Sequence, residues 1–273
     1  MKKNKSVLLS TPYLIWMVVF TLIPLGVVGY YALTDPATGV FSFVNLRSLG
    51  MYWGVLWQSI IYSLISAFIC LLLGYPVAYF IAHCGETTQK ILYMLVMLPM
   101  CMSFLLRTLA WVGLLQDTGL INRLLQAIGF SQLQLIRTPG AVVLGMVYNY
   151  LPFMILPIYT VLKKLDDGVL EAASDLGANA WQTFFRVTLP LSVPGVISGI
   201  TMVFLPSITT FAISVMLGSG KIYLAGDMIE DLFINLGNKN VGSALSLVLM
   251  VLILISIGFM RKVDPDGEGG TLM

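Results

Sequence analysis

Six long apolar runs dominate the chain, and polar residues gather in the short segments between them. A helix needs about 20 apolar residues to cross a bilayer core of about 30 Å. Each run reaches that length, and only the third holds a formal charge, Arg107. Strands of a membrane barrel would be about ten residues of alternating polarity, so the pattern predicts an all-α integral membrane protein with six transmembrane helices. The runs cover residues 12–33, 55–82, 91–115, 139–162, 191–217 and 241–260.

The composition indicates that lipid is the solvent for most of the chain. Hydrophobic residues account for 58% of it and charged residues for only 10%, against about 25% charge in soluble domains. A net charge of +2 is too small to indicate nucleic-acid binding. Cys70, Cys84 and Cys101 lie in or beside apolar runs, at spacings that match no metal or redox motif. We interpret them as packing residues and expect no bound metal.

The loop lysines and arginines predict the orientation, because cytoplasmic loops carry an excess of them. Nine lie on the side of both termini, which we therefore expect in the cytoplasm, and five lie on the other side. A basic start followed by an apolar run is also typical of a signal peptide, but no A-x-A site follows this run. We expect a cytoplasmic N-terminus at 1–11, a transmembrane domain at 12–262 and a flexible tail at 263–273. The nine are Lys2, Lys3, Lys5, Lys90, Lys163, Lys164, Arg186, Arg261 and Lys262, and the five are Arg47, Arg123, Arg137, Lys221 and Lys239.

The chain lacks the usual signs of an enzyme or an ion pump. Its nearest approach to a phosphate loop, at 218–221, has Val215 where the motif needs Gly and Ile222 where it needs Ser or Thr. The sole histidine, His83, ends the second run, where an interfacial role is expected. No Asp or Glu lies within a run, which argues against a proton-driven carrier with a carboxylate relay. If the protein transports a solute, its energy comes from elsewhere.

One cytoplasmic loop, residues 163–190, holds seven charges, a quarter of the total. Asp166 and Asp167 suit a helix start, and Gly177 suits its left-handed stop. Asn179 suits the cap of a second short helix, which Pro190 should separate from the fifth run. The two expected apolar faces are Val169, Ala172, Ala173 and Leu176 on the first helix, and Trp181, Phe184 and Phe185 on the second.

The first loop helix presents Ala172 and Ala173 beside Glu171, a shallow surface that another protein can approach closely. An amphipathic helix lying on the lipid surface explains the same spacing. The loop contains, in order, Glu171-Ala172-Ala173, three residues, Gly177, nine residues and Val-Thr-Leu189-Pro190. This order resembles the EAA loop of ABC importer permeases. Val187 stands where that pattern has Ile. The resemblance implies that this loop is the coupling helix that docks on a cytoplasmic ATPase subunit.

The resemblance extends over most of the chain, from about residue 22 to 260. Five stretches are similar to the first permease subunit of spermidine/putrescine importers, namely residues 73–80, 103–107, 138–145, 151–154 and 170–178. This resemblance implies that the chain is a type I ABC importer transmembrane domain that imports polyamines by alternating access. Sister permeases for other small solutes share much of the pattern, and a membrane assembly protein whose loop only binds a partner is the alternative outside transport.

The same resemblance implies the partners. They are an ATPase dimer that carries the ATP and Mg²⁺, a second related permease, and an extracytoplasmic substrate-binding protein. We therefore expect this chain to bind no cofactor and to catalyse no reaction.

Polar groups within the apolar runs are candidates for a translocation path, because lipid penalises polar groups at membrane depth. Hydroxyls, free carbonyls and aromatic faces suit a polycation, the last through cation–π attraction. The other interpretation is hydrogen-bonded packing between helices. The candidates are Ser59 and Tyr62 of the second run, Tyr148 and Asn149 of the fourth, and Pro206, Ser207, Thr210 and Ser214 of the fifth, where the hydroxyls should share a helical face.

Two charged features complete the expectations. Arg107 lies sixteen residues into the third run, which along one straight helix places it about 24 Å from the inner face, close enough to the outer surface to snorkel. Its charge would repel a polyamine, so we favour a structural role such as pairing with Asp117 or other outer carboxylates. The outer segment 221–239 holds Asp227, Glu230 and Asp231 with a net charge of −1. It suits attraction of a cation or contact with a binding protein, although solvated loop charges explain it equally.

Overall fold

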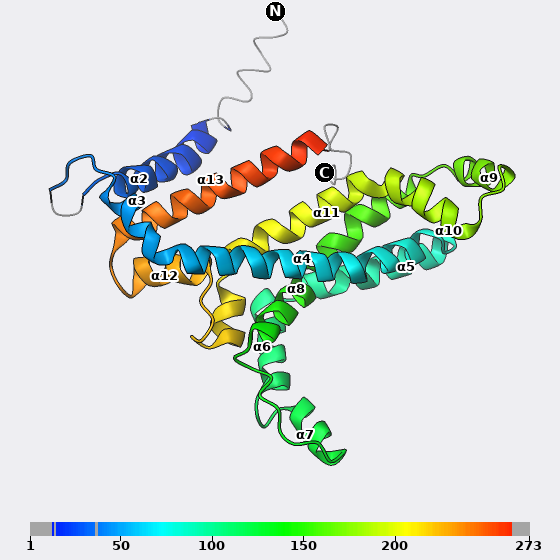
Figure 1. Ribbon diagram of the computed structural model, residues 1–273, viewed down its shortest axis with the longest axis horizontal. Helices are drawn as coiled ribbons and strands as arrows, with labels where there is room; N and C mark the ends of the chain where they lie inside the picture. The colour runs from blue at the N-terminus through cyan, green and yellow to red at the C-terminus, as the bar shows by residue number, and fades with distance from the viewer. Residues whose placement is uncertain (1–12, 14, 36–37, 264–273) are drawn as a thin grey trace, which may run out of the picture. The chain divides into compact units, whose positions relative to one another are not determined.

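The computed structural model describes residues 13, 15–35 and 38–263, and Figure 1 shows that these are almost entirely helical. The expected N-terminal segment 1–11 and the tail from 264 lie outside the described residues. The elements are η1 (Val18–Leu22), α2 (Ile23–Ala32), α3 (Val44–Ser48), η2 (Leu49–Tyr52), α4 (Trp53–Ala82), α5 (Glu86–Met97), η3 (Leu98–Cys101), α6 (Phe104–Leu115), α7 (Leu120–Ala127), α8 (Pro139–Lys163), α9 (Asp167–Asp175), α10 (Ala180–Thr183), η4 (Phe184–Thr188), α11 (Leu189–Thr209), η5 (Ser214–Gly218), α12 (Ala225–Ile234) and α13 (Lys239–Val263).

Among the described residues, five helices are long and apolar enough to cross a membrane, and a bent pair supplies the sixth. This agrees with the six predicted spans. By contacts the chain divides into two compact units, residues 1–54 with 228–252 and residues 55–227 with 253–273.

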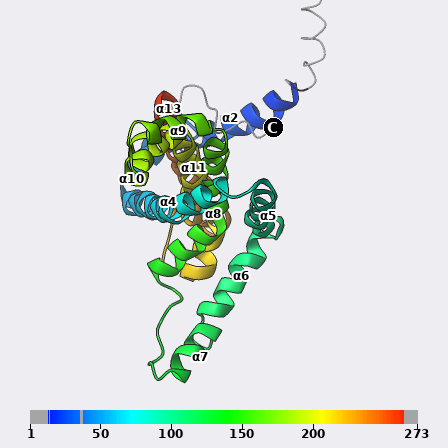
Figure 2. The same ribbon diagram turned by 90° about the vertical axis from the view of Figure 1, so that its right-hand side faces the viewer.

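The third span is not the continuous helix that its apolar run predicts. α5 and η3 end at Cys101, and the segment 104–127 leaves at an angle of 87°. Figure 2 shows α6 leaving α5 in a new direction and leading into α7. Pro99 lacks a backbone donor, and Met102 and Ser103 have extended backbones, with ψ of 149° and 130°. The expected depth of Arg107 along one straight helix is therefore wrong.

The fifth span also differs from its prediction, at both ends. Pro190 does not separate α10 from α11, because 180–209 forms one helical run of 30 residues. The π-helical turn η4 brings Pro190 into the first turn of α11, where a missing donor is tolerated. At the other end the helix stops at Thr209, and Thr210 is extended with ψ of 141°. Ser207, Thr210 and Ser214 therefore do not share one helical face.

The larger unit is built around α8, where 78% of the 18-residue apolar stretch that could cross a membrane is buried. α11 packs along it, and the two helices lie side by side (Figure 1). Small residues allow this close approach. A Cβ on Gly195 would lie 3.0 Å from the Pro157 carbonyl oxygen, and one on Gly199 would lie 2.7 Å from Met154 Sδ. Such small residues at helix contacts are the usual means of close packing in membranes.

In the smaller unit, two asparagines collect the carbonyl groups at the end of α2. Asn45 Nδ2 donates to the oxygens of Thr34 (2.8 Å) and Ala32 (3.2 Å). Asn240 Nδ2, at the start of α13, donates to the oxygens of Thr34 (2.7 Å) and Tyr31 (3.0 Å). These bonds satisfy carbonyl groups that the end of a helix leaves without partners.

Candidate functional site

The first helix of the charged loop forms as its sequence predicts. Asp166 caps α9 by accepting a 3.0 Å hydrogen bond from the Gly168 amide. At the other end Gly177 has a φ of +82°. The amides of Gly177 and Ala178 donate to the oxygens of Ser174 (2.9 Å) and Ala173 (3.1 Å), which is the Schellman pattern. The predicted start and left-handed stop are both confirmed.

The second loop helix, α10, is fixed by a capping box. The Gln182 amide donates to Asn179 Oδ1 (2.9 Å), and the Asn179 amide donates to Gln182 Oε1 (3.0 Å). Its three aromatic residues contact one another, since the Phe184 and Phe185 rings meet edge-on with centroids 5.0 Å apart, but they divide between two environments. Phe184 packs edge-on against Tyr75 and Tyr79 of α4, whereas Trp181 and Phe185 stack on each other, with ring centroids 5.7 Å apart.

The loop presents an apolar surface that the described residues of this chain leave uncovered. Leu176 is 89% exposed and Trp181 is 72% exposed. Glu171 and Ala172 are exposed and Ala173 is half-buried. Leu189 and Pro190, the last residues of the EAA pattern, open α11 directly after the loop. α9 and α10 lie together at one end of α8 and α11 (Figure 1).

Two of the candidate path hydroxyls are used inside this chain. Ser59 Oγ accepts from the Ala225 amide (2.7 Å) and donates to the Val55 oxygen (2.8 Å). Ser214 Oγ donates to Asp227 Oδ1 (2.8 Å). Both serines are fully buried. The bonds hold α4 and η5 against the start of α12.

Candidate polar groups also meet where α6, α8 and α11 approach one another. Asn149 Nδ2 donates to the Gly145 oxygen (2.9 Å) and to Thr108 Oγ1 (3.4 Å). The Tyr150 hydroxyl donates to the Pro206 oxygen (3.4 Å). Ser207 is fully buried and donates to the Val203 oxygen (2.7 Å).

Arg107 lies next to this group and is only 8% exposed. Its Nε and Nη1 atoms have no hydrogen-bond partner among the described residues, and the same is true of Asn149 Oδ1. The expected pairing with Asp117 is not formed within the described part of the chain. Leaving a buried polar atom unpaired costs about 1 to 3 kcal/mol, so the group has unused hydrogen-bonding capacity inside the membrane.

The two aromatic candidates, Tyr148 and Tyr62, are more accessible than these polar groups. Tyr148 is 38% exposed, and Trp111 of α6 packs edge-on against it with ring centroids 5.4 Å apart. Tyr62 is half-buried and accepts a 3.0 Å bond from Gln58. Sequence reasoning missed Trp111, because its partner lies on a different helix.

The outer acidic residues do not form one exposed group. Asp227 is 5% exposed and accepts 2.8 Å bonds from Ser214 Oγ and the Leu224 amide. Glu230 and Asp231 are half-buried, and Asp231 accepts a 2.7 Å bond from Asn235. Asp227 therefore organises the local chain at the start of α12.

Within the described part of the chain, five helices long and apolar enough to cross a membrane, with a bent pair as a sixth span, indicate a multi-pass membrane protein. A family model described as "binding-protein-dependent transport system inner membrane component" matches residues 71–266. The chain belongs to this family of inner-membrane permeases.

Two relatives match the chain over most of their length. The spermidine/putrescine transport system permease protein PotB of Haemophilus influenzae is 38% identical over 251 residues, 89% of this chain and 88% of that protein. PotB of Escherichia coli is 36% identical over 247 residues, covering 87% and 90%.

Solved structures confirm the fold as a type I ABC importer transmembrane domain. A chain of a bacterial ABC transporter that imports the acidic polysaccharide alginate superimposes with a TM-score of 0.75 at 19% identity, covering 96% of this chain and 97% of that one. A chain of the MetNI methionine ABC transporter gives 0.58 at 17% identity, covering 80% and 98%. At these identities the likeness concerns the fold.

Proposed function

We propose that this chain is a permease subunit of an ATP-driven importer for polyamines such as spermidine and putrescine. The identity of 36 to 38% to PotB proteins over nearly nine-tenths of the chain supports the substrate class. The observation that carries the mechanism is the exposed α9, held in shape by the Asp166 cap and the Gly177 stop, within an EAA sequence.

α9 docks on a cytoplasmic ATPase dimer, which binds the ATP and Mg²⁺, and this chain binds no cofactor. Both termini lie in the cytoplasm with the loop. A second, related permease completes the membrane unit, and a binding protein delivers the substrate from outside. Glu230 and Asp231 suit the contact with that protein.

Movement of the loop reaches the membrane through a continuous helix. The run 180–209 is about 45 Å long at 1.5 Å per residue, and Phe184 fixes its start against α4. The close contacts of Gly195 and Gly199 bind it to α8. When the ATPase dimer closes and displaces α9, α11 and α8 therefore move together. Alternating access follows from this movement.

For the path itself we favour groups that this chain leaves accessible. Tyr148, paired with Trp111, and Tyr62 offer aromatic faces, each worth about 0.5 to 2 kcal/mol to an amine cation. The six apolar runs of this chain contain no carboxylate, so we assign the acidic groups that neutralise a polyamine to the second permease.

Copurification tests the docking role. We expect that Ala172→Trp, which places a bulky ring on the α9 surface, removes the ATPase from the purified complex. Gln126→Trp on the exposed side of α7 is the matched control and should retain the ATPase. Equal ATPase content in both variants and in the unmodified complex would exclude α9 as the docking element.

A further inference from the structure

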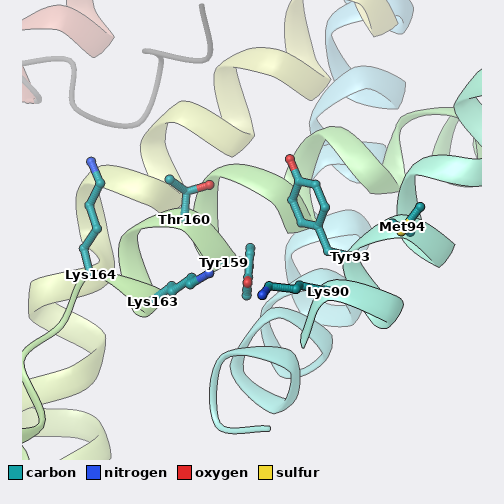
Figure 3. Close-up of a pocket in the computed structure, with 7 residues that line it drawn as sticks. All are labelled: Lys90, Tyr93, Met94, Tyr159, Thr160, Lys163 and Lys164. Carbon is teal, nitrogen blue, oxygen red and sulfur yellow. The ribbon is translucent and has the colours of Figure 1, made fainter. Parts of the chain in front are cut away.

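A cavity of about 610 Å³ lies between α5 and α8, at the end of α8 that leads into the loop. Figure 3 shows the side chains that line it, which combine amino groups, hydroxyls and apolar surface. The lining residues are Lys90, Tyr93 and Met94 of α5, Tyr159, Thr160 and Lys163 of α8, and Lys164.

The wall of this cavity is held in place by hydrogen bonds. Tyr159 is 6% exposed, and its hydroxyl donates to Gln89 Oε1 (3.3 Å). Gln89 Nε2 in turn donates to the oxygens of Ala82 and Cys84, both at 2.9 Å. The Tyr93 ring packs on Tyr159 with centroids 5.5 Å apart. The cavity is thus preformed, and a ligand needs little rearrangement to enter it.

The cavity carries concentrated positive charge. Lys90 and Lys163 extend toward the Tyr159 ring from the two helices (Figure 3), and Lys163 Nζ lies 5.9 Å from the ring centroid. Within the part of the chain that the structure describes, no carboxylate pairs with either amino group. The nearest acidic residue along α5, Glu86, lines a neighbouring cavity that Lys163 also borders.

The helix ends explain only part of this charge. Lys163 and Lys164 lie at the C-terminal end of α8, where a positive charge complements the helix dipole. Lys90 lies in the second turn of α5, near the positive end of that helix, so it gains nothing from the dipole. Its position is explained if the cavity takes an anion.

An apolar surface continues from the cavity along the outside of α5. Met94 and Leu98 follow Lys90 at intervals of four residues, so the three lie on one side of the chain. Met94 is 69% exposed and Leu98 is 61% exposed. A ligand that fits both parts has an anionic head and a hydrocarbon chain.

We propose that this cavity binds the headgroup of an anionic phospholipid. The phosphate lies between Lys90 and Lys163, Lys164 stands at the rim, and an acyl chain lies along Met94 and Leu98. Basic pockets between membrane helices are suited to such headgroups. The site depends on the packing of α5 on α8 and not on the ATPase, so it stands or falls separately from the docking role of α9.

Native mass spectrometry of the purified full chain tests the site. The chain, with any subunits that copurify, is equilibrated in micelles that hold equal amounts of phosphatidylglycerol and phosphatidylcholine. Both lipids contain a phosphate, but only phosphatidylglycerol has a net negative charge. We expect preferential retention of phosphatidylglycerol. A juxtamembrane lysine contributes about 1 kcal/mol to binding anionic lipid, so the variant Lys90→Gln/Lys163→Gln should bind it up to about 30-fold more weakly.

Two matched variants separate the site from general charge and from misfolding. Lys221→Gln/Lys239→Gln removes the same charge from two exposed lysines in another part of the chain and should retain the preference. Lys90→Arg/Lys163→Arg keeps the charge and should retain it as well. Equal loss in the two glutamine variants would overturn the proposal, as would equal retention of the two lipids by the unmodified chain.

A third arm distinguishes a lipid from a free anion. Inorganic phosphate at millimolar concentration should leave the bound phosphatidylglycerol in place, because it cannot replace the contacts with Met94 and Leu98. Displacement of the lipid by phosphate alone would show a site for a soluble anion and would refute the lipid assignment.

Discussion

Replacement of Gly177 by valine should break the link between the ATPase and the membrane helices. Gly177 adopts a φ of +82°, and a Cβ added there would have no atom within 4 Å. The cost of a side chain is therefore backbone strain and not collision. Left-handed backbone costs an L-residue about 1 to 2 kcal/mol, and a β-branched residue is an outlier in that region.

That strain is large for the element that must absorb it. α9 has nine residues, fewer than an isolated helix needs to be stable in water, and Leu176 beside the turn is 89% exposed. A loss of about 1 to 2 kcal/mol lowers the population of the observed turn by about 5- to 30-fold. We expect transport to fall by a similar factor.

The assay measures ATP-dependent spermidine uptake and binding-protein-stimulated ATPase activity in proteoliposomes that contain the complete complex. Gly177→Val should lose uptake and stimulation together. Gly177→Asn should keep most of both, because asparagine tolerates the left-handed region.

Gly129 supplies a matched control outside the loop. It has a φ of +94° with no atom near the position of an added Cβ, and it ends α7 with the same hydrogen-bond pattern, since the Phe130 amide donates to the Leu125 oxygen (2.9 Å). Gly129→Val incurs the same strain and should transport normally. Normal uptake by Gly177→Val, or an equal loss in both valine variants, would refute the reasoning.

Two further predictions concern stability and are measured as thermal unfolding of the purified protein. Gly199→Val should lower the unfolding midpoint, because its Cβ would lie 2.7 Å from Met154 Sδ and overpacking costs about 1 to 3 kcal/mol. Gly113→Val is the control and should leave the midpoint unchanged, because a Cβ there has no atom within 4 Å. Equal midpoints in the two variants would contradict the role of the α8–α11 contact. Asp227→Asn weakens one of two buried 2.8 Å hydrogen bonds and should lower the free energy of unfolding by about 1 to 3 kcal/mol. Glu230→Gln is the control and should change the midpoint little. An unchanged midpoint in Asp227→Asn would restore the interpretation of this residue as part of a binding surface.

Local signals in the sequence predicted the loop well. The cap at Asp166, the stop at Gly177 and the cap at Asn179 depend on neighbouring residues only, and all three are confirmed. The fourth apolar run also matches α8 at both ends to within one residue. Such features need no knowledge of tertiary contacts, because a few adjacent backbone groups decide them.

The sequence could not predict where the long spans break. A hydropathy profile adds the transfer energies of the side chains along a segment. This sum changes little at Pro99, Ser103 and Thr210. Their effect on the backbone depends on whether neighbouring helices satisfy the freed groups. The helix therefore breaks at Met102 and Ser103, shortly after Pro99, but continues past Pro190, where the π-turn removes the conflict.

Contacts between distant segments were likewise beyond sequence reasoning. Ser59 resembles a path residue until its bond to the Ala225 amide is seen. Asp227 resembles a solvated loop charge until its burial is seen. Lys90 and Lys163 become a candidate site only when α5 packs on α8.

The most direct test of the central claim is uptake of labelled spermidine by proteoliposomes that contain this chain with its permease, ATPase and binding-protein partners. The account predicts uptake that requires ATP and the binding protein and that unlabelled putrescine inhibits. Uptake that neither spermidine nor putrescine inhibits, or ATP-dependent uptake of a different solute by the same complex, would contradict the polyamine assignment.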